Sequence, residues 1–304
     1  MVAKNPPQKK PQVIATVITS LLLMVMASQS QADNGRLIRN GYSYLGAGIE
    51  FIDYKETDDD LLGTGLSLET ETTASPLTQR SGGFVAHESG WGFYIQTEAS
   101  IGNNTNHESW SIEGTKVQED SFSLRRSELR VLVAAPVFSS QSFLFGAAVQ
   151  DASFTRFDWS LTDQALYKID ATAGSVSEEM FKIFAYAGYE FGHFFIDGDT
   201  GWNWQVQLLA GIPLYSQTLN TGLGNETING GFDGYRLETD AAIGYRFSEN
   251  FMLGVSLKIA HEAQQEIESD LNITTSSGTT TVKRALPENT FLITQPALTF
   301  YWSF

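Results

Sequence analysis

The last ten residues of the chain constrain its fold more than any other segment. In this stretch apolar and more polar residues alternate, which is the pattern of a β-strand with two different faces. Leu298, Phe300, Trp302 and Phe304 fall on one face, and Thr299, Tyr301 and Ser303 fall on the other. Such a strand suits a wall between lipid and a wet interior. An edge strand of a soluble sheet is the alternative on this pattern alone.

The first 32 residues have the composition of a secretory signal. Three lysines precede an uncharged, mostly apolar run over 13–26, and Ser30-Gln31-Ala32 forms a small-x-small cleavage site. A helix over this run would be about 21 Å long, which is shorter than the ~30 Å hydrocarbon core of a bilayer. We therefore expect residues 1–32 to be cleaved and 33–304 to form the mature protein.

The overall composition narrows the class of protein further. The chain has no Cys, so disulfides and thiol chemistry are excluded. Its formal charge is −16, and removal of three signal lysines gives −16 − 3 = −19. Because a nucleic-acid binder needs a basic surface, no nucleic-acid partner is expected. The 27 Gly and 37 aromatic residues (Trp 6, Tyr 11 and Phe 20) suit a sheet with tight turns and aromatic girdles.

Segments with period-two alternation recur along the mature chain. Short and long polar connections alternate between them, as expected for an outer-membrane barrel with short periplasmic turns and long extracellular loops. The sequence predicts an all-β, transmembrane, antiparallel up-and-down β-barrel of about ten strands, and eight to twelve strands are compatible with it. The ten predicted strands lie near residues 42–54, 80–87, 91–101, 122–137, 142–157, 179–191, 202–212, 235–245, 253–259 and 295–304.

Together with the signal and the strand alternation, the C-terminal strand resembles the closing strand of outer-membrane β-barrels of Gram-negative bacteria, of a small porin-like class. The resemblance implies Sec-type export and residence in the cell outer membrane. It also implies that Phe300, Trp302 and Phe304 are an insertion signal and part of the periplasmic aromatic girdle. The implied partners are membrane lipid, lipopolysaccharide and the barrel-assembly machinery.

Strand parity assigns a set of charged side chains to the lumen. Six are basic and six acidic, so we expect them to pair with one another. One interpretation is a structural lining that fills a narrow barrel, and the other is a charged pore that selects solutes. The set comprises Glu50, Glu98, Arg126, Glu128, Arg130, Lys182, Glu190, Arg236, Glu238, Asp240, Arg246 and Lys258.

The sequence offers few residues for catalysis. None of the four His has a zinc-binding spacing, and no metal, cofactor or catalytic residue is predicted. His107 and His261 each precede a Glu near the outer ends of strands, where such a pair would activate water. The length and strand number are similar to those of the omptin proteases, but we find no early Asp-x-Asp pair with a later Asp-x-His pair.

These observations favour a barrel without enzymatic activity that passes small polar solutes or has a structural role. Two other classes remain as alternatives. One is an omptin-like hydrolase acting at the extracellular rim. The other is a surface-recognition or adhesion barrel that uses predicted loops at 55–80 and 159–178 to bind a ligand.

Overall fold

The computed structural model describes residues 38–59, 65–87, 91–101, 104–138, 140–162, 174–193, 200–221, 226–275 and 278–303. The predicted signal segment and Phe304 lie outside these ranges. No helix among the described residues is long and apolar enough to cross a membrane.

The described residues form sixteen strands. They are β1 (Ile38–Ile49), β2 (Phe51–Asp58), β3 (Leu68–Ala74), β4 (Leu77–His87), β5 (Gly92–Ile101), β6 (Asn106–Ile112), β7 (Thr115–Phe138), β8 (Gln141–Leu161), β9 (Ser175–His193), β10 (Gly201–Asn220), β11 (Glu226–Gly230), β12 (Gly234–Ser248), β13 (Phe251–Gln264), β14 (Ile267–Thr275), β15 (Gly278–Leu286) and β16 (Glu288–Ser303).

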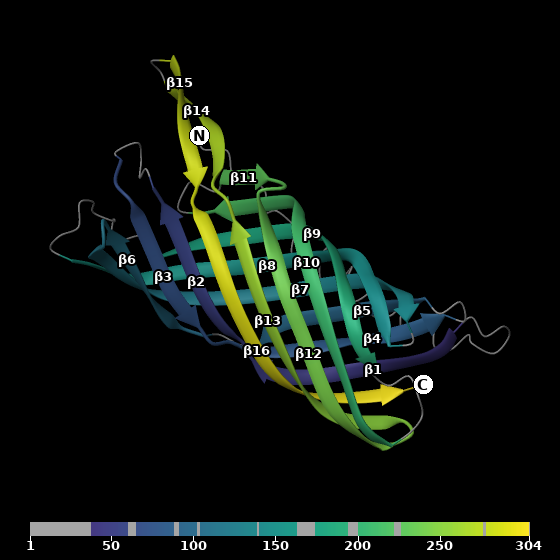
Figure 1. Cartoon of the computed structure of the whole chain (residues 1–304). Helices are drawn as coiled ribbons and strands as arrows, with labels where there is room; N and C mark the ends of the chain where they lie inside the picture. Colours follow the sequence, from purple (N-terminus) through teal and green to yellow (C-terminus); the bar gives the residue numbers. More distant parts are fainter. Residues whose placement is uncertain are drawn as a thin grey trace, which may run out of the picture.

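Ten wall strands close into one antiparallel barrel (Figure 1). Three of these wall strands are interrupted once, so that each is made of two numbered strands. The three are β1 with β2, β3 with β4, and β5 with β6. Every wall strand pairs with the next along the chain, and β1 closes the ring against β16 from Tyr42↔Ser303 to Gly48↔Ala297. The predicted fold class and the number of strands are confirmed.

The alternation along each strand separates a lipid face from a lumen face. In β13, Phe251, Leu253, Val255, Leu257 and Ile259 are exposed on the outside, while the residues between them are buried. Exposed apolar side chains continue as a band around the other wall strands. In a bilayer this band faces lipid, and the polar backbone groups are satisfied within the closed sheet.

Aromatic rings gather at the end of the barrel that carries the short turns, which we assign to the periplasm. Phe251 stacks against Phe300, with ring centroids 5.6 Å apart, and Phe300 lies 6.0 Å from Trp302. Trp202 and Tyr245 form a further pair at 5.4 Å. Phe300 and Trp302 thus lie among the rings at the end that carries the short turns, and their role in an inner girdle stays a prediction.

At the opposite, extracellular end the strands extend further than the sequence predicts. Much of the predicted loop over 55–80 is strand, since β2 continues to Asp58 and β3 begins at Leu68. The long polar connection predicted after the third strand is instead a hairpin of β6 and β7, turning at Glu113 and Gly114 with φ of 49° and 72°. These extensions are polar on their outer face, so they lack the apolar alternation that identifies a strand in lipid.

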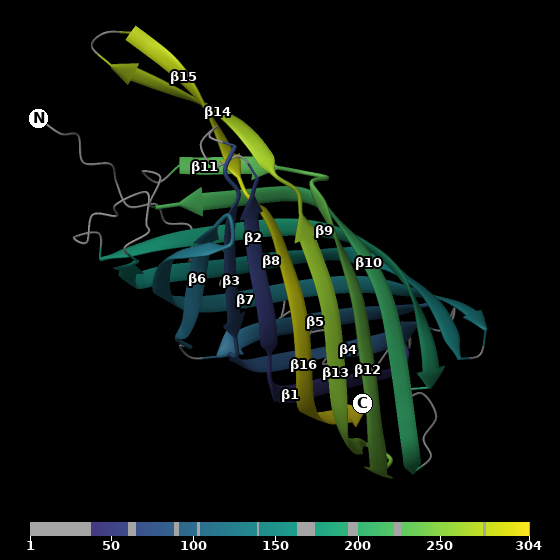
Figure 2. The same ribbon diagram turned by 60° about the vertical axis from the view of Figure 1, so that its left-hand side comes forward.

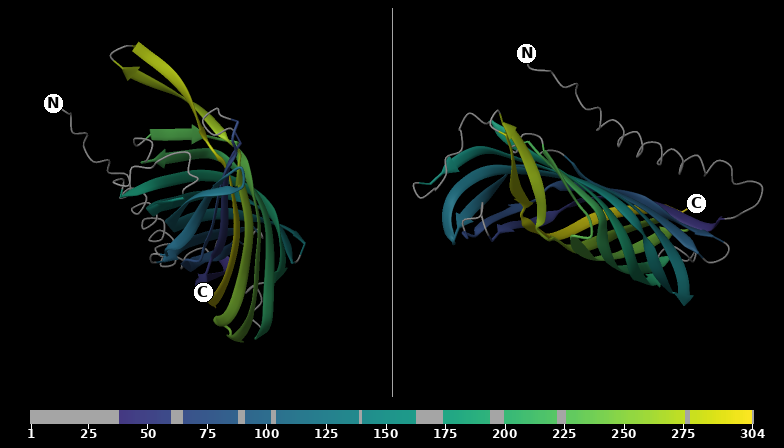
Figure 3. Two further views of the ribbon diagram at one scale, coloured as in Figure 1. Left: turned by 90° about the vertical axis from the view of Figure 1, so that its left-hand side faces the viewer. Right: turned by 90° about the horizontal axis from the view of Figure 1, so that it is seen from above.

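Further elements stand at the extracellular end. Strand β11 pairs with the end of β10. Strands β14 and β15 pair only with each other and rise beyond the barrel wall (Figure 2). The curved wall is seen from two other sides in Figure 3.

The lumen is filled by three layers of side chains. The periplasmic layer is aromatic and aliphatic and includes Tyr44, Phe84 and Tyr186. The extracellular layer has the same character and includes Tyr54 and Phe154. Between them lies a layer of buried charged and amide side chains. This arrangement resembles the filled interior of a narrow barrel more than a water-filled channel.

The lipid face provides a test of the membrane placement. Leu208 lies midway along the apolar outer face of β10, so Leu208→Arg should lower the free energy of unfolding by ~2–4 kcal/mol. Ser109→Arg, on the outer face of β6 beyond the apolar band, should cost ~0–1 kcal/mol. Urea unfolding in lipid vesicles measures both changes. Equal small costs would contradict the placement of β10 in the membrane.

Candidate functional site

The structure places all twelve of the predicted lumen charges on the inner face of the barrel. Eleven are buried, and the twelfth, Glu98, has a side chain that is only 10% exposed. Arg236 is fully buried. A buried charge is tolerated only when other groups pair with it, so the network around these residues determines whether the lumen is stable.

Several ion pairs connect wall strands that face each other across the lumen. Arg130 of β7 donates two hydrogen bonds to Glu238 of β12, at 2.6 and 2.8 Å. Lys258 of β13 lies 2.8 Å from Glu98 of β5. Three wall strands separate the partners along the shorter way around the ring in both cases. These pairs cross the lumen and occupy its centre.

Each of the central carboxylates accepts from more than one cation. Glu128 is 2.5 Å from Arg130 and 2.7 Å from Arg236, and Glu238 also accepts from Arg236 at 2.8 Å. Because Arg130 and Arg236 each bond both Glu128 and Glu238, the network is continuous and does not divide into separate pairs.

A second part of the network centres on Arg126 near the break between β1 and β2. Its guanidinium bonds Glu50 at 2.5 Å and Glu98 at 2.8 Å. The Glu98 carboxylate is therefore shared between Arg126 and Lys258, which connects this part to the central pairs.

Two of the predicted residues make other contacts. Glu190 accepts hydrogen bonds from Gln205 and Gln207 at 2.6 and 2.8 Å. Arg246 donates to the backbone carbonyl of Glu249 at the periplasmic turn. Both side chains are buried, and the contacts of Glu190 are made by neutral amides.

The sequence analysis missed two members of the network. Arg80 pairs with Asp240 and donates to Ser256 at 3.0 Å, and Glu262 accepts from Lys182 at 2.7 Å. Arg80 lies in β4, where the alternation is too weak to assign faces. Glu262 follows Lys258 by four residues, so extending the parity of β13 would have placed it inward.

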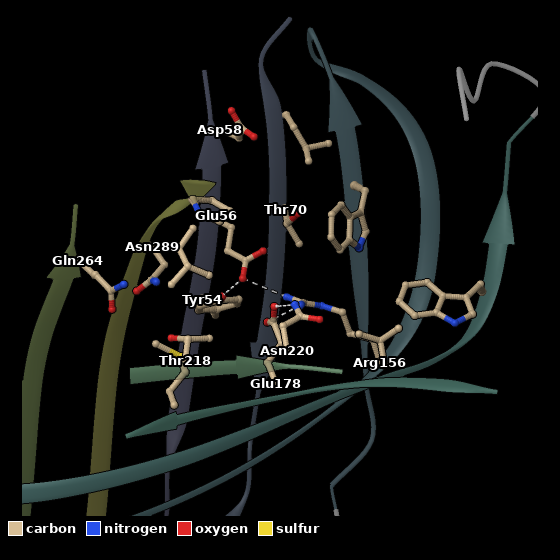
Figure 4. A pocket seen from close by; sticks show the side chains of 17 residues that line it. Tyr54, Glu56, Asp58, Thr70, Arg156, Glu178, Thr218, Asn220, Gln264 and Asn289 are labelled. Atoms are coloured by element: carbon tan, nitrogen blue, oxygen red, sulfur yellow. Dashed lines mark hydrogen bonds and ion pairs between the residues drawn. The ribbon is translucent and has the colours of Figure 1, made fainter. Parts of the chain in front are cut away.

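A cup opens at the extracellular mouth, above the outer apolar layer, and sequence reasoning did not identify it. Figure 4 shows side chains that line it, and its volume is about 310 Å³. The lining combines aromatic rings, carboxylates, amides and one guanidinium from strands on all sides of the barrel. The lining includes Tyr54, Glu56, Asp58, Thr70, Trp110, Arg156, Trp159, Glu178, Asn220, Gln264 and Asn289.

Arg156 organises one side of the cup. It donates to Glu108 at 2.6 Å, to Glu178 at 2.8 Å and to Glu56 at 3.2 Å, so three carboxylates from three other strands share one guanidinium. The guanidinium also lies 5.3 Å from the ring of Trp110. This cation–π contact and the ion pairs fix both side chains.

The environment raises the pKa values of several acidic side chains in this cluster. Burial raises the pKa of Glu108 to about 8, although the nearby Arg156 acts in the opposite direction. Burial also raises the pKa of Glu178 and of Asp120, against hydrogen bonds that favour their charged forms. These groups lie beyond the apolar band, in the part of the barrel that extends past the membrane on the extracellular side.

The His–Glu neighbours considered for catalysis do not form a joint site. His107 is exposed on the outer face, whereas Glu108 points inward to Arg156. His261 stacks on Tyr235 on the outer face, with ring centroids 5.7 Å apart, and Glu262 points inward to Lys182. Successive strand residues point to opposite faces, which separates both pairs.

Comparison with known proteins supports the fold. No protein-family model matches the sequence, and no curated protein matches it. Among solved structures, the outer membrane protease OmpT from Escherichia coli is similar with a TM-score of 0.58 and 10% identity, over 89% of this chain and 99% of that chain. The chain folds as an outer-membrane β-barrel.

Other outer-membrane proteins are less similar. The outer membrane protein OprG from Pseudomonas aeruginosa has a TM-score of 0.33 at 10% identity, over 87% of this chain and 96% of that chain. The translocator domain of the autotransporter NalP from Neisseria meningitidis has a TM-score of 0.32 at 7% identity, over 97% of this chain and 98% of that chain. At such identities the similarity concerns the fold alone.

Glu108 should make the stability of the outer-membrane β-barrel depend on pH. Its side chain ionises near pH 4.5 in the unfolded chain and near pH 8 in the folded one, so unfolding releases a proton between these values. The free energy of unfolding should therefore fall as pH rises through this window, by up to about 1.4 kcal/mol per pH unit, and level off above it.

The conservative variant Glu108→Gln isolates this contribution because the amide does not titrate. Urea unfolding from pH 4 to 9 should give a smaller decline for the variant than for the wild type. Parallel curves would contradict the raised pKa. The exposed Glu119→Gln serves as a control that leaves the decline unchanged.

Proposed function

We propose that this outer-membrane β-barrel is a closed surface-recognition protein that binds a small ligand in the cup at its extracellular mouth. The observation that carries the proposal is the filled lumen beneath an open, polar and aromatic cup. The proposal favours the recognition alternative of the sequence analysis over porin-like passage of solutes.

The lumen supports a closed barrel in two ways. The charged layer is crossed by paired side chains, and a solute passing through it would have to break them. Rings and aliphatic side chains close the lumen on both sides of that layer. The pocket beside Arg80 and Asp240 has a volume of about 30 Å³, enough for about one water molecule.

The cup supports a binding role. Concave sites with apolar walls and a few convergent polar groups are where small ligands usually bind, and volumes of roughly 300 Å³ and above are typical. The Arg156 cluster holds the wall of the cup in a defined geometry before any ligand arrives. Preformed sites lose less conformational entropy on binding.

The same geometry supports a role without catalysis. A rim hydrolase of the alternative class would need an imidazole and an acid facing one cavity. The lining of the cup contains Glu56, Asp58 and Glu178 but no His among the described residues. We further expect the partners implied by the resemblance, namely outer-membrane lipid, lipopolysaccharide and the assembly machinery.

Planar-bilayer recording tests whether the barrel is closed. The refolded wild type should show no stable conductance steps, and Arg236→Ala should also stay silent because the two apolar layers remain. A triple variant, Phe84→Ala, Arg236→Ala and Phe154→Ala, removes bulk from all three layers and should conduct. Heat-dependent gel migration confirms that each variant is folded. Stable conductance by the wild type would refute the proposal.

A further inference from the structure

The cup contains buried polar atoms for which the protein provides no partner. They are Thr70 Oγ1, Asn289 Oδ1, Trp159 Nε1, and both Oε1 and Nε2 of Gln264. Thr70 is 0% exposed, Gln264 is 3% exposed and Asn289 is 6% exposed. Buried polar groups are nearly always hydrogen-bonded, so four such side chains around one cavity point to a ligand that completes their bonding.

The unpaired atoms define what kind of ligand fits. Gln264 presents a donor and an acceptor, Trp159 presents a donor, and Asn289 presents an acceptor. An anion only accepts hydrogen bonds, and it would also meet the carboxylates of Glu56 and Glu178. An ammonium-type cation only donates hydrogen bonds, so it would leave the Trp159 N–H unpaired, and it would be repelled by Arg156. Hydroxyl groups donate and accept, so a neutral polyhydroxylated molecule matches the whole set.

The aromatic side chains add a second requirement. Trp110 and Trp159 both line the cup. The ring of Trp110 is held in place by Arg156 and by a hydrogen bond from its Nε1 to Asp120 at 2.9 Å. Flat, rigid rings offer apolar contact area at a small entropic cost, and the C–H face of a sugar ring is a suitable partner. The volume of about 310 Å³ is at the lower end for ligand sites.

We propose that the cup binds a neutral saccharide whose hydroxyls bond Gln264, Asn289, Thr70 and Trp159 while its apolar face packs on the tryptophans. This inference rests on the proposed recognition function and names its ligand class. Free oligosaccharides and the sugars of surface lipopolysaccharide share this chemistry, so the experiment includes both sources.

The test uses the full mature chain, refolded in a zwitterionic detergent that has no sugar headgroup. Fluorescently labelled protein is applied to an array of neutral glycans, and positives are titrated by calorimetry. Purified lipopolysaccharides with complete and truncated sugar chains form the second arm. We expect saturable binding to at least one neutral glycan, and binding to complete but not truncated lipopolysaccharide would identify the membrane source.

The decisive variant is Gln264→Leu, which removes both unpaired amide atoms with little change in volume. It should bind the selected glycan at least tenfold more weakly while its urea midpoint without ligand is equal to or higher than that of the wild type. Gln265→Leu is the matched control, because Gln265 is exposed and lies outside the lining of the cup, and it should leave binding unchanged.

The outcomes separate the ligand class from the recognition function. Binding of spermidine or inorganic phosphate but of no neutral glycan would overturn the saccharide and retain a recognition cup. If neither the array nor these ions bind, both the saccharide and the cup function fail. Undiminished glycan binding by Gln264→Leu, or a lowered urea midpoint for this variant, would also overturn the inference.

Discussion

The structure depends on one constraint, which is that charges inside a narrow barrel must be neutralised by one another. A ten-strand ring leaves little room for water, and unpaired buried charges cost several kcal/mol each. Arg130, Arg236 and Lys258 meet Glu238, Glu128 and Glu98 from other parts of the wall. The ion pairs therefore hold opposite sides of the barrel together and close it at the same time.

This constraint divides the molecule into regions with different tasks. The lipid face uses every second residue of a strand, and these residues only have to be apolar. The residues between them face the lumen and make the ion pairs and hydrogen bonds. The interior layers of Tyr44 and Tyr54 exclude water from both sides of the ion pairs, which strengthens the electrostatic attraction between them. At the mouth, above Tyr54, five buried polar atoms of four side chains that line one cavity have no partner in the protein. Under the proposed function, the barrel is a rigid base for a small recognition surface.

Much of the fold was predictable from the sequence because period-two alternation is a local property. The ten strands, the closed ring and the inward direction of the twelve charges follow from parity within each strand. The partners could not be predicted, because Arg80 and Asp240 are 160 residues apart and their contact depends on the register and tilt of the closed sheet. The predicted mutual pairing did not anticipate that Glu190 accepts hydrogen bonds from the neutral amides of Gln205 and Gln207.

The cup was missed for a different reason. Its residues lie in extensions such as β3 and β6, where the outer face is polar and the apolar outer face that identifies a membrane strand is absent. Gln264 and Asn289 are ordinary residues in the sequence, and they gain meaning only because β13 and β16 place them opposite each other. Glu56 and Glu178 fall in the predicted loops over 55–80 and 159–178, and the sequence does not show that Arg156 lies between them.

The most direct test of this account is a double-mutant cycle on Arg130 and Glu238, using Arg130→Gln and Glu238→Gln with urea unfolding in lipid vesicles. A pair that holds the barrel together across a filled lumen should show a coupling energy of about 1–3 kcal/mol. The exposed pair Lys55 and Glu69, 2.8 Å apart, should couple by less than ~1 kcal/mol in a parallel cycle. If the changes in the free energy of unfolding caused by the two lumen substitutions add to within about 0.5 kcal/mol, the account is contradicted.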